Sequence, residues 1–318
     1  MKILITGGSG FIGTNIIEEL IKNSEDILNL DICKPKIFEH LPYWNKVNVM
    51  DFDQFAAAVN KFKPDTIIHL AARTDLIKSA DLSDYSVNIL GVKNLLKIIQ
   101  NQHVKNVIHF STMLVHSRQS LLSGGAPNPD TDYGRSKLFG EKLITNSSAQ
   151  HRSQVTLLRP TSLWGPWFGT PYDQFFKFAR KRILFFPRRP LAKKSFGYIS
   201  NCVEQTLKFV YSEPHVGLKG PFYLADTNPI SISSFTNRIR QIEGLREPIY
   251  CPSALFYIAS FVGDCLNWFG VKFPLNSYRW ANLIQDRYVN SQDIVRINQD
   301  RVVGFDDAIK TTLKWMKN

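Results

Sequence analysis

The feature that most constrains this chain is the glycine cluster TGGSGFIG at residues 6–13, which directly follows the short hydrophobic run KILIT at residues 2–6. Two dinucleotide-binding spacings, GxGxxG and GxxGxxG, are satisfied by Gly7, Gly8, Gly10 and Gly13. Residues without a Cβ let backbone N–H groups approach a pyrophosphate, and the N-terminus of the following helix stabilises its charge. Because the cluster lies between a predicted strand and a predicted helix, we expect a phosphate-binding turn.

An acidic residue stands where such a turn needs one. Asp31 ends the second hydrophobic run, eighteen residues after Gly13. Its carboxylate can accept hydrogen bonds from ribose hydroxyls and would repel a 2′-phosphate, so it favours NAD over NADP. Lys34 and Lys36 lie close by and would favour the opposite preference.

Hydrophobic runs and helical patterns alternate through the first half of the chain. Five further runs predict strands, at residues 26–31, 46–51, 65–72, 105–112 and 154–160. Between them, apolar residues at spacings of three and four predict helices at residues 13–22, 51–62, 86–100 and 133–144. Six strands joined by helical crossovers predict an α/β fold, a doubly wound parallel sheet of the Rossmann type.

The regular alternation of predicted strands and helices ends after Gly165, where prolines and aromatic residues cluster. We therefore predict two domains, an NAD-binding domain at 1–165 and a smaller substrate-binding domain at 166–318. The chain is expected to return to the first domain within about 197–225. The cleft between the domains is the expected site.

Composition narrows the class of protein. The chain has 318 residues with 44% hydrophobic content, enough for a large core, which excludes disordered and fibrous classes. Its 39 Lys and Arg against 27 Asp and Glu leave a net charge of +12, which indicates an anionic partner. The four cysteines lie far apart without a CxxC pair, so we expect neither a metal site nor disulfides, and a cytoplasmic protein.

Neither of two hydrophobic segments has the pattern of a signal peptide or a membrane span. The N-terminal run is too short for the core of a signal peptide. The longest apolar run, Leu255 to Phe269, contains Asp264 and Asn267 and falls short of a membrane span. We expect it to form a buried helix, and we expect no transmembrane segment.

Candidate catalytic residues follow the fifth predicted strand. Ser111 and Thr112 lie at its C-terminal end, where open parallel sheets bind ligands. Twenty-one residues later comes Tyr133-Gly-Arg-Ser-Lys137. Four residues on a helix bring Tyr133 and Lys137 to one face, where an ammonium can stabilise a phenolate and lower the pKa of the tyrosine. The pair predicts a proton-transfer device.

Together these motifs resemble the extended short-chain dehydrogenase/reductases, in the branch of NAD-dependent nucleotide-sugar epimerases and dehydratases. The resemblance covers nearly the whole sequence and extends to His69-Leu-Ala-Ala72, LLRPTSLWGP at 157–166 and GFDDAIKTTLKWM at 304–316. It implies that Thr112, Tyr133 and Lys137 are catalytic. It also implies an NAD site made of Gly7, Gly10, Phe11, Ile12, Gly13, Asp31, Asp51, Phe52, Leu70, Ala71, Ala72, Asn88, Ser111, Tyr133, Lys137 and Pro160.

Departures from the family pattern affect the expected reaction. Dehydratases of the family usually place Asp-Glu after the catalytic Thr, whereas this chain has Met113 and Leu114, which cannot move protons. His116 replaces the usual Tyr beside the sugar. Gly197 stands where many relatives carry a diphosphate-binding arginine, so another cation must bind that group.

A basic segment supplies candidate cations. Residues 177–194 hold eight Lys or Arg and no acid, and phenylalanines within it could stack on a base. A nucleotide sugar, plain solvated surface, RNA and an anionic membrane all remain compatible with it. The substrate-binding residues we expect are Thr112, Ser162, Arg188, Arg189 and Arg279, with Arg287 a weaker candidate.

The predicted function is an NAD-dependent epimerase that inverts a hydroxyl, at C4, of a nucleotide-diphosphate sugar. The alternative is a nucleotide-sugar dehydrogenase or 4-keto-sugar reductase that uses the same residues. A non-catalytic Rossmann module that binds RNA or a protein is the alternative from another class, although we expect no nucleic acid as partner. The resemblance also implies a homodimer.

Overall fold

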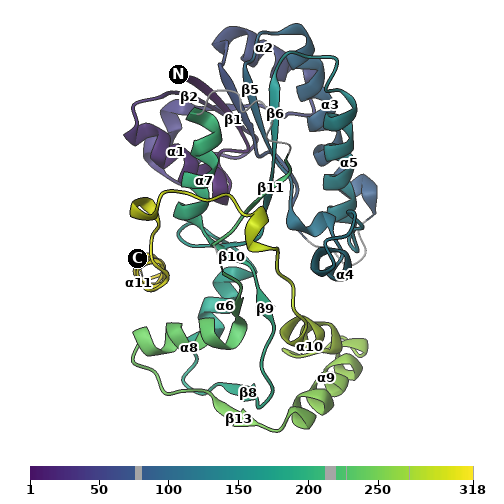
Figure 1. Cartoon of the computed structure of the whole chain (residues 1–318), viewed down its shortest axis with the longest axis vertical. Coiled ribbons are helices and arrows are strands. Elements are labelled where there is room, and N and C mark those ends of the chain that lie inside the picture. The colour runs from purple at the N-terminus through teal and green to yellow at the C-terminus, as the bar shows by residue number, and fades with distance from the viewer. Residues whose placement is uncertain (76–80, 212–219, 227, 272, 318) are drawn as a thin grey trace.

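The computed structural model describes residues 1–75, 81–211, 220–226, 228–271 and 273–317, which form a larger and a smaller lobe (Figure 1). The larger lobe is built on a seven-stranded parallel sheet in the order β11-β6-β5-β4-β1-β2-β3. Its strands are β1 (Lys2–Thr6), β2 (Asp26–Asp31), β3 (Trp44–Lys46), β4 (Thr66–His69), β5 (Asn106–Phe110), β6 (Gln154–Pro160) and β11 (Phe222–Leu224). This is the predicted Rossmann-type α/β fold, and the prediction is confirmed.

Helices cover both faces of the sheet because its central strands are apolar on both sides. Ile3 and Ile5 of β1 pack on the face covered by α1 (Phe11–Lys22) and α7 (Ile199–Tyr211). Leu4, between them, packs on the opposite face with α2 (Phe52–Phe62) and α3 (Ser86–Asn101). The helix α5 (Asp132–Asn146) packs beside α3 on that face, and the short α4 (Arg118–Leu122) precedes it.

Two details of the sheet differ from the prediction. The third strand occupies Trp44–Lys46 and not residues 46–51, because pairing with β2 ends where β2 ends, at Asp31. Val47 and Val49 are nevertheless buried, so their hydrophobicity reflects packing against helices and not a strand. The seventh strand, β11, comes from the second half of the chain and pairs with β6. Of the predicted return at 197–225, residues 212–219 lie outside the described residues.

The smaller lobe contains short strand pairs and helices. Its pairs join β7 (Ser162–Trp164) with β10 (Phe196–Tyr198), β8 (Phe185–Pro187) with β13 (Ile249–Cys251), and β9 (Lys193–Lys194) with β12 (Ile230–Ser231). Its helices are α6 (Tyr172–Ala179), α8 (Ile232–Ile242), α9 (Ser253–Trp268) and α10 (Ser277–Ile284), and α11 (Phe305–Trp315) packs against α8. Within this lobe Trp164 of β7 makes ring contacts with Phe176, Tyr198, Phe235 and Phe305, and so joins β7, β10, α6, α8 and α11. The domain boundary at residue 165 stays a prediction.

The apolar run Leu255 to Phe269 forms α9, but the prediction that this helix is buried is wrong. Only Ser260 and Gly263 of α9 are buried. The helix lies at the edge of the smaller lobe, where α10 packs against one side of it and Phe256 stacks on Trp280. Hydrophobicity alone cannot tell a buried helix from one that presents apolar residues outward.

No helix within the described ranges is long and apolar enough to cross a membrane. All four cysteines are free, and no group of three metal-ligating side chains occurs among the described residues.

The backbone packing of the glycine turn gives the first testable prediction. A Cβ on Gly13 would overlap the backbone of Gly8, which cannot move without reshaping the turn. We expect Gly13→Ala to destabilise the protein by about 1–3 kcal/mol, the usual cost of overpacking, and to weaken NAD binding. Gly169→Ala is the control, because a Cβ there meets nothing within 4 Å. Equal unfolding midpoints in urea for both variants would contradict the close approach.

Candidate active site

The candidate site lies along the carboxyl edge of the parallel sheet. The chain proceeds from β1 through β2 to β3 in one direction and then returns to β4 on the other side of β1. Ligands of doubly wound sheets bind at such a reversal of strand order. Here Gly7, after β1, approaches the segment after β4 so closely that a Cβ on it would lie 2.6 Å from the backbone nitrogen of Ala71.

The residues at this reversal fit a dinucleotide. Helix α1 begins at Phe11, and no side chain among the described residues caps its N-terminus at Gly10. Its first N–H groups are therefore free to bind an anion, as the glycine pattern predicts. Ser111, at the end of β5, is buried, and its Oγ has no hydrogen-bond partner among the described atoms. A cradle of glycines, an uncapped helix and an unpaired buried hydroxyl all suit a bound pyrophosphate and ribose.

Asp31 is held beside the phosphate turn. One of its carboxylate oxygens accepts a hydrogen bond from the backbone N–H of Ser9 at 3.0 Å, and the other accepts one from the N–H of Cys33 at 2.9 Å. The carboxylate thus sits at the mouth of the turn, where it would meet the ribose of a bound dinucleotide.

Other expected NAD contacts already have roles within the protein. The Asp51 carboxylate caps α2 by accepting from the N–H of Gln54 at 3.0 Å, and the next residue, Phe52, lies under the Lys97 ammonium. Asn88 bonds the backbone of Arg73 and donates to the Ser136 hydroxyl at 2.9 Å. Leu70, Ala71 and Ala72 follow β4, and Pro160 ends β6. Their contacts with NAD stay predictions.

The catalytic candidates are brought together by α5 and the short turn after β5. Tyr133 and Lys137 are buried on the same face of α5, and the Tyr133 hydroxyl is hydrogen-bonded to Thr112. Thr112 lies at the N-terminus of the turn Met113–Val115. The ring of Tyr85 packs against that of Tyr133, with 6.0 Å between the ring centroids. Sequence spacing alone placed Tyr133 near Lys137 but not near Tyr85.

Burial sets the protonation of this group. It raises the pKa of Tyr133 to about 12, opposite to the lowering that the sequence predicts, and the hydrogen bond with Thr112 only partly offsets it. Burial also lowers the pKa of Lys137 to about 8, and the nearby Glu141 carboxylate acts against that shift. The two buried histidines, His69 and His109, are kept neutral because desolvation and the Lys137 charge lower the pKa of each. The positive charge of an oxidised nicotinamide would favour the Tyr133 phenolate.

A glycine within the YxxxK segment was not singled out from the sequence. A Cβ on Gly134 would overlap the carbonyl oxygen of Leu114. Only a glycine therefore lets α5 approach the turn after β5 and bring Tyr133 to Thr112. The sequence did contain a signal for this close approach, namely a glycine directly after the candidate catalytic tyrosine.

A buried polar network behind the catalytic residues was also missed. Arg159 of β6 pairs with both carboxylate oxygens of Glu141, at 2.9 and 2.6 Å. The same guanidinium contacts His116 Nε2 at 3.1 Å and the Tyr223 hydroxyl at 3.2 Å. His116, which departs from the family pattern, thus turns inward to Arg159. Glu141 lies eight residues after Tyr133 and four after Lys137, so helical spacing could have placed it on the catalytic face.

Two expected substrate contacts lie away from the catalytic residues. Arg188 and Arg189 follow β8, at the end of the smaller lobe that is far from α5 in Figure 1, and Arg279 lies on α10. Arg189 donates to the Tyr257 hydroxyl of α9 at 3.3 Å, and Arg279 donates to the carbonyl of Pro274 at 2.7 Å. Ser162, by contrast, lies on β7 next to the sheet and is hydrogen-bonded to Tyr172. All four assignments stay predictions.

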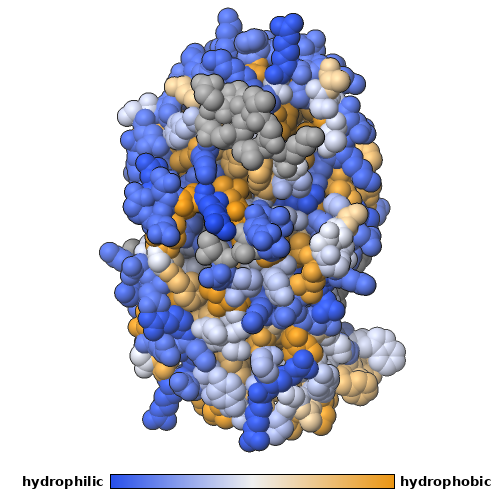
Figure 2. Space-filling view, viewed as in Figure 1, coloured by the Kyte–Doolittle hydropathy of each residue, from blue (hydrophilic) through white to orange (hydrophobic). Residues whose placement is uncertain are grey.

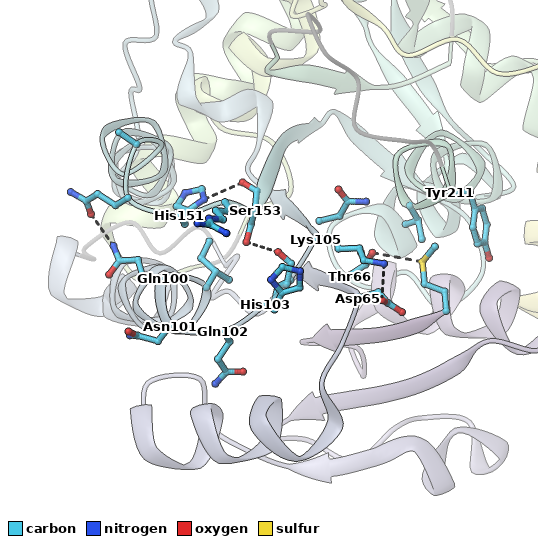
Figure 3. Close-up of a pocket in the computed structure, with 18 residues that line it drawn as sticks. Asp65, Thr66, Gln100, Asn101, Gln102, His103, Lys105, His151, Ser153 and Tyr211 are labelled. Atoms are coloured by element: carbon cyan, nitrogen blue, oxygen red, sulfur yellow. Dashed lines mark hydrogen bonds and ion pairs between the residues drawn. The ribbon is translucent and has the colours of Figure 1, made fainter.

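A cavity of about 1030 Å³ at the other edge of the sheet is not this site (Figure 3). It is lined by residues at the amino ends of β4 and β5, such as Asp65, Thr66 and Lys105, together with His103 and His151. Its polar groups bond one another, as His151 does with the carbonyl of Ser153. The amino ends of parallel strands are opposite to the ligand-binding edge.

Fold and site together fit the class of Rossmann-type enzymes that bind a dinucleotide at the carboxyl edge of the sheet. Comparison with known proteins narrows this class: the NAD dependent epimerase/dehydratase family model matches residues 3–216, so the chain belongs to that family. NAD is accordingly its cofactor.

Relatives within the family differ in activity. The chain is 25% identical over 267 residues to a 3 beta-hydroxysteroid dehydrogenase/Delta 5-->4-isomerase of Mycobacterium tuberculosis (strain CDC 1551 / Oshkosh), covering 78% of this chain and 70% of the relative. It is 25% identical over 286 residues to the N-acetyl-alpha-D-glucosaminyl-diphospho-ditrans,octacis-undecaprenol 4-epimerase of Escherichia coli O157:H7, covering 87% of this chain and 84% of the relative. These matches support the family without selecting one reaction.

Solved structures show the same fold. UDP-glucuronic acid 4-epimerase from Bacillus cereus, in complex with UDP-glucuronic acid and NAD, superposes with a TM-score of 0.75 at 19% identity. The match covers 100% of this chain and 99% of that one.

The Tyr133 hydroxyl gives a direct prediction. Tyr133→Phe removes one proton-transferring oxygen and little volume, so turnover should fall by a factor of about 10² to 10⁴ while NAD binding is retained. Calorimetry with NAD and a rate assay on the accepted substrate measure the two effects. Tyr85→Phe, on the adjacent ring, is the matched control and should keep most activity. A Tyr133→Phe variant with the wild-type rate would show that another group moves the proton.

Lys137 gives a prediction about stability and pH. The pKa of Lys137 is lowered from 10.5 to about 8 in the folded protein, because its ammonium is buried there. Folding therefore disfavours the charged form of this lysine. The resulting penalty is fully present below pH 8 and disappears as the pH rises towards 10.5. We expect Lys137→Met to lose turnover, yet without NAD at pH 7 to be more stable than wild type by up to about 3 kcal/mol.

Urea unfolding between pH 7 and 10 tests this, and the stability gain should shrink across the range. Lys142→Met is the control, because Lys142 is exposed on the same helix. A Lys137→Met variant that is less stable than wild type at pH 7 would contradict a net cost of burying this ammonium.

Proposed function

We propose that this protein is an NAD-dependent epimerase that inverts the C4 hydroxyl of a sugar carried on a diphosphate. The observation that carries the proposal is the buried group formed by Thr112, Tyr133 and Lys137 at the dinucleotide-binding edge of the sheet. The choice of C4 is supported by 4-epimerases of the family among the similar proteins, including a structure with UDP-glucuronic acid bound.

Each of the three residues has a role that its position supports. Tyr133 takes the proton of the sugar hydroxyl, and Thr112, hydrogen-bonded to the tyrosine, holds the same oxygen. Lys137 holds a positive charge close to the dinucleotide ribose and stabilises the phenolate electrostatically. NAD, when bound by the glycine turn and Asp31, would supply the hydride acceptor for oxidation of the sugar and the hydride donor for reduction on the other face. Tyr133 then returns the proton to the new hydroxyl.

Dehydration is disfavoured by the side chains next to Thr112. Met113 is buried and Leu114 is half-buried, and neither can donate or accept the proton that elimination of water requires. The hydroxyl pair of Thr112 and Tyr133 serves oxidation and reduction at a carbinol carbon, and no acid accompanies it in this turn.

The diphosphate of the substrate can be held by Lys194 and Arg287. Many relatives carry a diphosphate-binding arginine at the position of Gly197. This chain has no room for that side chain there, because a Cβ on Gly197 would lie 2.7 Å from the Cys202 sulfur and from Leu163. Lys194 and Arg287 instead lie side by side, and Arg287 pairs with Asp130, three residues before Tyr133. Burial and the Arg287 charge lower the pKa of Lys194 to about 8, so this pair of cations would gain from a bound dianion.

The protein is further proposed to act as a homodimer through α3 and α5. These helices pack together, and their outer surface carries the exposed apolar residues Leu90 and Phe139. The proposal of a homodimer rests on the family pattern. Leu90 and Phe139 are exposed apolar residues that could be buried in such a dimer interface.

A dehydrogenase is the second candidate. The similarity to a 3 beta-hydroxysteroid dehydrogenase favours it, since the same three residues can oxidise a carbinol without returning the hydride. The two reactions differ in whether the cofactor is regenerated within one turnover.

One experiment tests substrate and reaction together. The protein with NAD is incubated with UDP-, GDP-, dTDP- and CDP-sugars and with a polyprenyl-diphosphate sugar in detergent, and the anomeric and ring protons are followed by NMR. A single donor converted to its C4 epimer supports the proposal. Conversion to a keto sugar with equimolar reduced cofactor would assign a dehydrogenase, and no conversion of any donor would overturn the sugar substrate.

The mechanism also predicts the fate of a label. A substrate deuterated at C4 should keep its deuterium in the product, because the hydride leaves and returns within one protein molecule. No reduced cofactor should accumulate. Mass spectrometry of the product in ordinary water measures the label. Loss of deuterium to solvent would mean deprotonation at carbon, which Thr112, Tyr133 and Lys137 cannot explain.

A further inference from the structure

The outward face of α9 is an apolar surface for which neither the fold nor the proposed function accounts. Exposed residues recur along the helix at spacings of three, four and seven, which places them on one side. They are Leu255, Tyr257, Ile258, Phe261, Val262, Cys265 and Trp268, followed by Phe269 and Val271 beyond the helix end. Phe261 is 68% exposed, Phe269 74% and Trp268 82%.

The face contains almost no charge. Asp264 is the one ionisable carboxylate of α9, and it lies at the edge, where it accepts hydrogen bonds from the N–H of Ser277 at the start of α10. Monomeric proteins seldom expose so many large apolar side chains on one side of a helix, and a partner usually covers such a surface. Figure 2 shows apolar surface interrupted by hydrophilic side chains in the lower part of the molecule, which holds α8, α9 and β13 in Figure 1.

A strand pair extends this apolar surface. Phe185 of β8 and Ile249 of β13 are paired in register, so they point to the same side, and both are about half exposed. Cys251 ends β13, and α9 begins two residues later. Ile183 and Tyr250 add further exposed apolar side chains to this end of the lobe.

Cations flank the apolar residues. Arg189 contacts the Tyr257 hydroxyl of α9 at 3.3 Å, and the N–H of Arg188 bonds the carbonyl of Cys251 at 2.9 Å. Lys181 and Arg182 precede β8, and Arg279 stands on α10 beside the exposed Tyr278. Among the described residues, Arg182, Arg188, Arg189 and Arg279 form no ion pair, and Glu247 is the exposed acid near β13.

We propose that this end of the smaller lobe, formed by α9, β8 and β13, docks on an anionic phospholipid membrane. Apolar and aromatic side chains of α9 would enter the region between headgroups and acyl chains, which Trp and Tyr prefer. The flanking arginines would meet the lipid phosphates. With 16 residues, α9 is too short to cross a bilayer and would lie along its surface.

Charge complementarity selects a membrane over a second copy of the chain. A second copy would bring the same arginines into the interface, and among the described residues Asp264 and Glu247 are the exposed acids of α9 and the β13 end that could offset them. An anionic lipid surface supplies phosphate to every arginine at once. The inference does not depend on the proposed reaction, since it uses none of the residues proposed to bind NAD or to move the proton. Arg188, Arg189 and Arg279, which the sequence predicts as substrate contacts, are assigned here to lipid phosphates instead.

Flotation with vesicles tests the proposal on the full chain with NAD bound. The vesicles are phosphatidylcholine alone, or equal parts of phosphatidylcholine and phosphatidylglycerol. We expect binding to the anionic vesicles, weakened by salt, and much weaker binding to the neutral ones. Phe261→Ser should reduce the partition coefficient about tenfold, because one large apolar side chain no longer enters the bilayer. Arg188→Gln combined with Arg189→Gln should also weaken binding, mainly at low salt.

Phe38→Ser is the matched control, because Phe38 is 79% exposed but lies in the larger lobe. It should leave vesicle binding unchanged, and all variants should unfold at the wild-type urea midpoint. Absence of binding to anionic vesicles would overturn the proposal. So would a Phe261→Ser variant that binds like wild type, or one whose only change is a smaller oligomer in sedimentation, which would assign the face to a second copy.

Discussion

The hydrogen bonds of Thr6 fix the geometry on which the candidate site depends. Thr6 ends β1 beside His69 of β4, and its hydroxyl bonds His69 Nδ1 at 2.8 Å and the N–H of Ala71 at 3.3 Å. Its carbonyl accepts from the N–H of Leu70 at 2.9 Å. These bonds draw the segment after β4 against Gly7, where only a glycine fits. The reversal of strand order thus becomes a narrow cradle, and a longer side chain in it would push the cofactor away from the catalytic helix.

Much of this was predictable, because the fold follows from short-range patterns. The glycine cluster, the alternation of strands and helices, and the spacing of Tyr133 and Lys137 are local signals that need no knowledge of distant contacts. The candidate site depended more on contacts between distant segments. Helical spacing pairs Tyr133 with Lys137, but only packing shows that Gly134 admits Leu114 or that Arg159 reaches His116. The direction of the pKa shift of Tyr133 was wrong for the same reason, since burial outweighs any charge that spacing alone suggests.

The smaller lobe was less predictable because its signals are ambiguous. A run of apolar residues predicts a helix, but whether it faces the core depends on which elements pack against it. Among the described elements, α10 is the one that packs closely against α9, and most of the hydrophobic residues of α9 are exposed. The basic segment at residues 177–194 was ambiguous in the same way. Its cations divide in space: Arg188 and Arg189 lie at the end of the lobe beside α9, whereas the partly buried Lys194 lies close to Arg287. We therefore propose a different anion for each group: lipid phosphates for the arginines beside α9, and the substrate diphosphate for Lys194 and Arg287.

The central claim is that one buried tyrosine moves a proton while hydride leaves and returns to the same sugar carbon. Rapid mixing of the NAD-bound protein with its accepted sugar donor tests it most directly, with absorbance recorded in the band of the reduced cofactor. The account predicts a rise to a level well below one equivalent per site, which stays constant while epimer continues to form, and no such rise with Tyr133→Phe. Epimer formed without any rise, or a rise that grows in step with product, would contradict it.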